Sequence, residues 1–279
     1  MYIYIYIYIY TYIHIYIHIY IHFIMSSLSS INTHSRDEII SFDPIPHVYS
    51  IKSDPNSLYT SVTTWVHSHF SNFNADIIIN KMIKSKNWIN NKYYGMSSKD
   101  IKKLWNDNRD SAANLGTILH YDIECYYNDT PHNNNTLEFT YFKNFTHDFP
   151  SLKPFRTEWN IWDYDLKIAG SVDMVFQNDD GTIMIYDWKR CKEINKHSSF
   201  NKFAITPCIE HLPDTNYWHY TLQLNIYKFI IEKNYAKIVS HLRIVVLHPN
   251  NKNYIIHNLP ILQNEIHDLI NLRINTLLN

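Results

Sequence analysis

Cysteine is scarce in this chain, and its scarcity excludes several classes of protein. The 279 residues include three cysteines at irregular spacing, Cys125, Cys191 and Cys208. Three thiols cannot form the even-numbered disulfide framework of a small secreted domain, and their spacing matches no zinc-binding pattern. An iron–sulfur cluster held by four thiolates is also excluded by the count. We therefore expect an intracellular protein of a reducing compartment, the cytoplasm or the nucleus.

Glycine and net charge are also low, and each of them restricts the interpretation. The chain has four glycines, and three of them, Gly116, Gly170 and Gly181, lie within or beside the candidate site described below. Glycine is needed where the backbone adopts a positive φ or must be approached closely. The net charge of −1 excludes a wholesale polycation, so any binding to nucleic acid requires a local basic patch.

Residues 81–109 form such a patch. They contain eight lysines or arginines against two aspartates, a net charge of +6. Aromatic residues are interleaved with the basic ones, as in surfaces that follow a nucleic-acid strand: Trp88, Tyr93, Tyr94 and Trp105. A solvated helix face is the alternative interpretation of such a charge run.

The chain begins with a repeat, because residues 2–22 alternate tyrosine or histidine with isoleucine almost perfectly. The stretch is long and uncharged, so a membrane span is one interpretation. However, it lacks the positively charged start of a signal peptide, and its period of two does not fit an ordinary apolar helix. A TA dinucleotide repeat read in one frame encodes Tyr-Ile. We therefore interpret the segment as a translated microsatellite, with Met25 as the working start and no stable membrane association.

Deletion of residues 1–24 is expected to leave the activity and the melting temperature unchanged and the solubility equal or better. The reason is that the repeat contains no caps, turns or binding pattern, and two apolar faces make it prone to β-aggregation. Membrane fractionation of the native protein checks this expectation. Recovery in the detergent phase that is lost on the deletion would contradict it.

Composition and periodicity divide the chain into four segments. Residues 1–25 are the low-complexity repeat and are expected not to be structural, and residues 26–46 are polar and turn-rich, as in a loose lead-in. Residues 47–115 have a helical pattern, with Asn74 and Ser98 as plausible N-caps. Residues 116–279 combine helical and strand patterns.

The last segment predicts an α/β fold. From Gly116 the order is a helix, three strands, a helix and a strand, with a shorter strand and a closing helix after them. This order indicates a mixed central sheet flanked by helices. The predicted helices cover residues 115–127, 217–235 and 262–278, and the strands cover residues 155–163, 169–175, 183–189, 241–247 and 254–259.

The most informative feature is a hairpin. Two runs rich in valine and isoleucine flank Asp179-Asp180-Gly181, and a three-residue loop closed by a glycine of positive φ makes Asn178 and Thr182 the first partners. Pairs along the ladder then place Asp173 opposite Asp187, with Lys189 two residues further on the same face. Like charges that face each other destabilise a sheet, so this pair of carboxylates needs a cation. Acids pointing into solvent are the alternative.

Two predicted helices each carry a pair of polar residues four positions apart, and residues at this spacing share a helix face. His120 and Glu124 lie on the helix before the strands, where the imidazole is an acceptable third ligand for Mn²⁺ or Mg²⁺. Gln223 and Tyr227 repeat the spacing on the later helix. For each pair, an ordinary half-buried helix face is the alternative.

Taken in order, four short motifs resemble those of the RecB-type PD-(D/E)XK nucleases. The motifs are Gly116-Thr117-Ile118-Leu119-His120, Gly170-Ser171-Val172-Asp173, Asp187-Trp188-Lys189 and Gln223-x-x-x-Tyr227. They cover about residues 116–250, and the helical region before them is only loosely similar. The family includes exonuclease domains of bacterial recombination machines and CRISPR adaptation nucleases. The resemblance implies a restriction-endonuclease-like core.

The resemblance also implies a role for each matching residue. His120, Asp173 and Asp187 would ligate Mg²⁺ or Mn²⁺ together with the carbonyl of Trp188. Lys189 would be catalytic alongside Asp173 and Asp187. Gln223 and Tyr227 would line the DNA side of the site, and Glu158 and Glu124 are auxiliary acidic candidates. The four-cysteine cluster of several relatives is missing, so no iron–sulfur cluster is expected.

The sequence therefore predicts a metal-dependent deoxyribonuclease, an exonuclease of DNA repair, recombination or replication. A helicase or recombination partner is not identified by any pattern. The abundance of asparagine, isoleucine, lysine and tyrosine fits an AT-rich genome, such as that of a large DNA virus or a protist. The alternative function is a nucleic-acid-binding module of the same fold that does not cleave.

Overall fold

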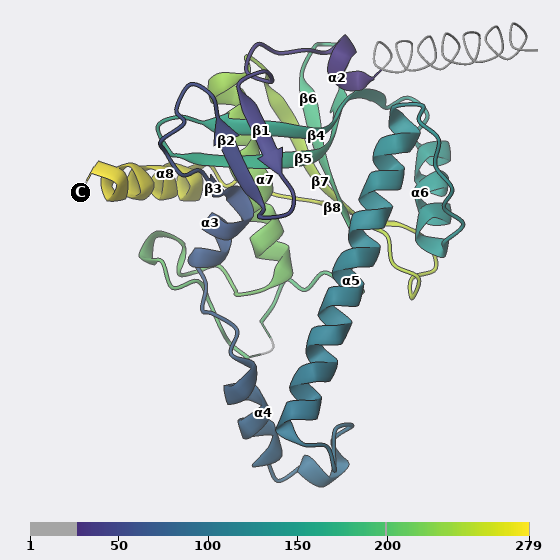
Figure 1. Ribbon diagram of the computed structural model, residues 1–279, viewed down its shortest axis with the longest axis vertical. Coiled ribbons are helices and arrows are strands. Elements are labelled where there is room, and N and C mark those ends of the chain that lie inside the picture. Colours follow the sequence, from purple (N-terminus) through teal and green to yellow (C-terminus); the bar gives the residue numbers. More distant parts are fainter. Residues whose placement is uncertain (1–26, 199, 279) are drawn as a thin grey trace, which may run out of the picture.

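The structure of the protein is a computed structural model that describes residues 27–198 and 200–278 (Figure 1). Residues 1–24, on which the repeat and deletion predictions fall, lie outside the described residues. The helices are α2 (Leu28–Ile31), α3 (Val62–Ser68), α4 (Ala75–Ile83), α5 (Ser98–Tyr127), α6 (Leu137–Asp148), α7 (Asn216–Asn234) and α8 (Gln263–Leu278), with short 3₁₀ turns η1 (Trp88–Asn90) and η2 (Pro207–Ile209). The strands are β1 (Ile40–Asp43), β2 (Val48–Ile51), β3 (Thr60–Ser61), β4 (Lys153–Asp163), β5 (Ile168–Gln177), β6 (Ile183–Lys189), β7 (Val239–Val246) and β8 (Ile255–Asn258).

A mixed sheet forms the centre of the molecule. Its strands follow the order β3-β5-β6-β7-β8, and β4 pairs with β5 in addition. The pairs β3–β5 and β6–β7 are parallel, and the others in this sheet are antiparallel. The predicted α/β class, with a mixed sheet flanked by helices and a helical N-terminal region, is confirmed.

Helices cover both faces of this sheet, which explains why its central strands are continuously apolar. On one face, Ile183 and Ile185 of β6 share a buried cluster with residues of α3, α7 and α8. On the other face, Met184, Tyr186 and Trp188 share a second buried cluster with residues of α5 and α6. The alternation of side chains along β6 therefore assigns its odd-numbered residues, Asp187 and Lys189 included, to the α7 side.

The edge of β5 opposite β4 has a gap where the site is located. Strand β4 pairs along β5 from Gln177 to Ile168. Strand β6 pairs with residues 174–177 and β3 with residues 168–169. A strand has two hydrogen-bonding edges, so β3 and β6 share the edge opposite β4. Among the described residues, no strand pairs with residues 170–173 on that edge, and these residues are the second motif.

Two predicted boundaries are wrong. The predicted loose lead-in of residues 26–46 is ordered in its described part, residues 27–46, which contains α2 and β1, and Asp37 accepts hydrogen bonds from Arg156 and Trp159 of β4 at 2.7 and 3.0 Å. The division at residue 115/116 is not structural either, because α5 runs unbroken through Gly116. The helical pattern before Gly116 and the helix that carries His120 are one 30-residue helix.

Other local predictions differ in detail. Asn74 caps α4 as predicted, and α5 is capped by Ser97 in place of Ser98: the Ser97 side chain accepts from the amide of Asp100. Helix α6 is missing from the predicted order of elements, and short strands β2 and β3 lie within the segment predicted to be helical. Within the described residues, no helix is long and apolar enough to cross a membrane.

Candidate metal centre

The hairpin between β5 and β6 has the predicted turn and register. The Asn178 amide donates to the Thr182 carbonyl at 2.8 Å, and Gly181 has a φ of +83°. The ladder continues through Gln177–Ile183 to Met174–Tyr186. One further step in this register places Asp173 opposite Asp187. The loop length therefore fixes the register that leads to the two aspartates, and the paired part of the ladder ends one step before them, at Met174 and Tyr186.

The ladder ends just before the two aspartates, and a side chain continues the pairing. The Trp188 amide donates to Oδ2 of Asp173 at 2.9 Å instead of to a backbone carbonyl. This contact lies at the start of the gap on β5, so the Asp173 carboxylate holds the two strands together where their backbones separate. A carboxylate that accepts a backbone N–H is fixed in orientation, as a metal ligand must be.

The His120 ring reaches this end of the hairpin from α5. Its Nδ1 lies 3.5 Å from Oδ2 of Asp173 and 3.7 Å from Oε1 of Glu158, and its Nε2 lies 2.8 Å from the Trp188 carbonyl oxygen. Burial alone lowers the pKa of His120, but the carboxylates of Asp173 and Glu158 outweigh it and raise the pKa to about 9. The imidazole carried by α5 thus lies beside the carboxylates of Asp173 and Glu158.

Glu158 completes a group of three side chains that could hold a metal ion. Ligand atoms of His120, Glu158 and Asp173 all lie within 4.8 Å of one another. Strand β4 places Glu158 between Thr157 and Trp159, whose partners on β5 flank Asp173. The backbone of Glu158 has a φ of +42°, a left-handed conformation that costs a non-glycine residue about 1–3 kcal/mol. Strain of this kind is concentrated at functional sites, which supports a functional role for this residue.

Asp187 and Lys189 form a buried ion pair beside this group. Lys189 Nζ lies 2.6 Å from Oδ2 of Asp187, which is 2% exposed. Burial raises the pKa of Asp187 to about 7, with Asp173 adding to the rise and Lys189 opposing it. Burial alone lowers the pKa of Lys189, but Asp187 and Asp173 outweigh it and hold that pKa well above its ordinary value. Lys189 is therefore a permanent positive charge next to the cluster.

The donor atoms fit a hard divalent cation. Carboxylates, one imidazole and one backbone carbonyl suit Mn²⁺, and the oxygen ligands suit Mg²⁺. Oδ2 of Asp187 is buried and, despite its contact with Lys189, makes no hydrogen bond of good geometry. Because this oxygen lies 2.6 Å from Lys189 Nζ, and because Asp187 is outside the group of three, Asp187 would bind an ion only by sharing its carboxylate with Lys189. The residues that would hold an ion are His120, Asp173, Asp187, Glu158 and the carbonyl of Trp188.

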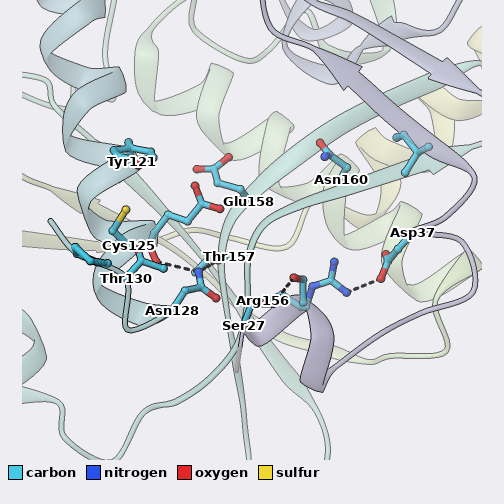
Figure 2. Close-up of a pocket in the computed structure, with 14 residues that line it drawn as sticks. Ser27, Asp37, Tyr121, Cys125, Asn128, Thr130, Arg156, Thr157, Glu158 and Asn160 are labelled. Atoms are coloured by element: carbon cyan, nitrogen blue, oxygen red, sulfur yellow. Dashed lines mark hydrogen bonds and ion pairs between the residues drawn. The ribbon is translucent and has the colours of Figure 1, made fainter. Parts of the chain in front are cut away.

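Glu124 adjoins the cluster without joining the group of three. It lines, together with Glu158, a hollow of about 540 Å³ between α5 and β4. Figure 2 shows Glu158 of β4 facing Tyr121 and Cys125 of α5 across this hollow. Burial raises the pKa of Glu124, and the charge of Glu158 raises it further. Glu124 therefore lies near Glu158 but outside the group of three.

Gln223 and Tyr227 lie on α7, and Tyr227 contacts the second motif at Gly170. The Gln223 amide donates to the hydroxyl of Tyr227 at 3.0 Å and to that of Thr63 at 3.1 Å. The Tyr227 ring is buried and packs against the backbone of Gly170. Gln223 thus positions a buried tyrosine that packs against Gly170 of the second motif.

Substitution of Gly170 by alanine is expected to lower the free energy of unfolding by about 1–3 kcal/mol, the usual cost of overpacking. A Cβ at this position would lie 2.6 Å from Cε1 of Tyr227. Urea denaturation measures the loss. The matched control is Gly116→Ala, because no atom lies within 4 Å of that Cβ and alanine is favoured within a helix, so a gain of about 0.5–1 kcal/mol is expected. Equal stabilities of the two variants would contradict the close packing at Gly170.

Two further tyrosines at the site are not singled out by the sequence analysis. The Lys189 ammonium lies 4.9 Å from the ring centroid of Tyr220 on α7. Tyr220 precedes Gln223 by three residues and Tyr227 by seven, so helical spacing could have placed it on the same face. Burial raises the pKa of Tyr49 on β2, and the charge of Glu158 adds to the rise. No sequence pattern points to Tyr49, because its strand lies outside the four motifs.

Comparison with known proteins identifies no family. No family model and no curated protein sequence matches the chain. The solved structures that it resembles include one described as "Crystal structure of SSO0001", with a TM-score of 0.30 and 16% sequence identity over 78% of this chain and 83% of that one. The function is therefore inferred from the residues of the site.

Proposed function

We propose that this protein is a metal-dependent deoxyribonuclease of the PD-(D/E)XK type. The observation that carries the proposal is the buried pair Asp187–Lys189 at the end of strand β6, beside the group of His120, Glu158 and Asp173. Three carboxylates, an imidazole and a lysine at one sheet edge combine a cation site with a fixed positive charge. Hydrolysis of a phosphodiester needs both of these, because negative charge develops on the phosphate oxygens.

Each side chain has a distinct role in this proposal. A bound divalent ion would lower the pKa of a water molecule and stabilise charge on the scissile phosphate. Lys189 donates to a phosphate oxygen and stabilises the charge that develops there. Asp187 orients the Lys189 ammonium, and the Trp188 amide orients the Asp173 carboxylate. Gln223 and Tyr227 support the DNA side of the site through Gly170.

The cellular setting belongs to the same proposal. The three cysteines are free, with Cys125 buried and the other two half-buried, as is usual in a reducing compartment. DNA is the proposed partner, and processing of DNA ends during repair, recombination or replication is the proposed context.

The experiment that tests the proposal is a cleavage assay with the full chain on linear and circular, single- and double-stranded DNA. Each substrate is incubated with Mg²⁺, Mn²⁺ or a chelator, and the products are sized. Cleavage of linear DNA that requires the metal and leaves circles intact is expected of an exonuclease. Metal-independent binding without cleavage of any substrate would reject the nuclease and favour the binding module.

The affinity for the metal ion is expected to decrease as the pH is lowered, because metal ions and protons compete for the same ligand atoms. Between about pH 7 and pH 9, His120 carries the proton that must leave, so affinity should drop about tenfold for each unit that the pH is lowered. Below about pH 7, Asp187 also takes up a proton, and the dependence should become steeper. Calorimetric titration with Mn²⁺ across this range measures the slope. An affinity that does not change with pH would contradict the ligand assignment.

A further inference from the structure

One strongly basic part of the molecule is not used by the metal centre. Helix α4, the turn η1 and the first half of α5 project away from the sheet as an arm (Figure 1). Residues 81–109 of this arm have a net charge of +6, so the other 250 residues of the chain sum to −7. Charge separated in this way attracts a polyanion to the arm in preference to the rest of the surface.

The lysines of the arm are available for such a ligand. All eight basic side chains of residues 81–109 are exposed. Lys102 and Lys103 form ion pairs with Asp76 and Asp107, and Arg109 pairs with Asp110. The remaining five have no ion-pair partner among the described residues: Lys81, Lys84, Lys86, Lys92 and Lys99.

Exposed apolar side chains lie among these lysines. Tyr94 is 56% exposed and Ile89 is 65% exposed, and Phe73 at the start of the arm is 70% exposed. A DNA duplex presents phosphates and sugars to a surface of this kind, whereas a single strand also presents the faces of its bases. An exposed ring among the lysines, Tyr94, and a second at the start of the arm, Phe73, therefore favour a single strand as the ligand.

Helix α5 connects the arm to the metal centre and sets the distance between them. It is continuous from Ser98 at the arm to His120 at the site, and 22 residues at 1.5 Å each span about 33 Å. The helix is capped by Ser97, α4 contacts α5, and Ile79 of α4 and Ile101 of α5 are 1% and 0% exposed. The start of α5 at Ser98 is thus held at a fixed distance from the metal centre at His120. A strand with a rise of about 3.4 Å per nucleotide covers this distance in about ten nucleotides.

We propose that the arm of residues 73–109 is a second DNA-binding surface, which holds a single strand about ten nucleotides, or fewer if the strand is extended, from the phosphate that is cleaved. The inference rests on the proposed nuclease function for its distance, and on the arm alone for its binding. The arm therefore defines the substrate class as single strands of a minimum length. Strands long enough to reach from the metal centre to the arm are bound well, and shorter strands are bound poorly.

Binding is tested without cleavage, on the full-length Lys189→Ala protein in the absence of metal. Fluorescence anisotropy with a labelled 24-nucleotide strand measures the dissociation constant at several salt concentrations. The triple variant Lys81→Gln/Lys84→Gln/Lys86→Gln is expected to reduce the slope of log affinity against log salt by about 2. Each phosphate contact with a single strand contributes roughly 0.7 to this slope, and the variant removes three lysines. Tyr94→Ala is expected to weaken binding about 5- to 150-fold through the loss of one stacked base. The control Lys52→Gln/Lys153→Gln/Lys252→Gln removes the same charge from the body of the protein and should leave the slope unchanged.

Cleavage of strands of 4 to 24 nucleotides tests the reach. We expect KM to fall sharply once the strand exceeds about ten nucleotides or somewhat fewer, and this step should disappear in the arm triple variant while kcat is retained. An unchanged salt slope in that variant, or a duplex that competes as well as a single strand, would overturn the inference. If the arm binds as expected but no strand is ever cleaved, the proposed function fails and the binding surface stands. If strands are cleaved with no dependence on length or on the arm lysines, the arm inference fails and the nuclease stands.

Discussion

Replacement of Lys189 by alanine is expected to lower the rate of DNA cleavage by about 10²–10³-fold, the usual effect of removing one group that stabilises transition-state charge. Lys189 is the permanent cation of the site, held 2.6 Å from a buried carboxylate. Single-turnover cleavage at saturating DNA measures the chemical step and separates it from binding. The dissociation constant for DNA should change little, because the arm lysines remain.

The fold should tolerate this substitution. Without Lys189, the pKa of Asp187 rises further above its ordinary value, so the carboxyl group takes up a proton and no uncompensated charge stays buried. The matched control is Lys153→Ala, which removes an exposed lysine paired with Asp179 at the opposite end of the hairpin. Cleavage by the Lys189→Ala protein at the wild-type rate would exclude a catalytic role for Lys189.

Replacement of Asp173 by asparagine is expected to abolish cleavage and to weaken Mn²⁺ binding by at least tenfold, because a neutral amide is a poorer ligand for a hard cation than a carboxylate. Asparagine still offers an oxygen to the Trp188 amide, which now donates to Asp173 at 2.9 Å. It also removes one of the carboxylates that crowd the site. The free energy of unfolding should therefore be unchanged or slightly higher, while the activity is lost.

A second substitution at the same position separates charge from structure. Asp173→Ala leaves the Trp188 amide without its acceptor and is expected to cost about 1–3 kcal/mol of stability in addition to the activity. Asp179→Asn, in the exposed turn, is the control that changes the same residue type away from the site. Equal Mn²⁺ affinities for the wild-type and Asp173→Asn proteins would exclude Asp173 as a ligand.

The hairpin was predictable because its turn is local. Asp179-Asp180-Gly181 sets the loop length, the loop length sets the register, and one step beyond the last pair, Met174 and Tyr186, this register leads to Asp173 and Asp187. The cap at Asn74 and the strand of residues 183–189 have the same local character. These features depend on a few neighbouring residues, so the local sequence is sufficient to predict them.

Features that depend on distant contacts could not be predicted in this way. Glu158 is only an auxiliary candidate in the sequence, because its place in the group of three depends on pairing between β4 and β5 and on a positive φ that no sequence pattern indicates. Helix α6 follows an asparagine-rich stretch, and its aromatic side chains are buried only because the sheet packs against them. The segment of residues 26–46 appears polar and loose, yet the Asp37 contacts to β4 fix it. Gly116 suggests a helix boundary in the sequence, but α5 continues through it from Ser98 to Tyr127.

The most direct test of the metal centre is anomalous diffraction from crystals of the full chain soaked in Mn²⁺. The account predicts one strong peak, bonded to Asp173 and shared among Glu158, Asp187, His120 and the carbonyl of Trp188, and absent from crystals of Asp173→Asn. A peak elsewhere, or none at a Mn²⁺ concentration that supports cleavage, would contradict it.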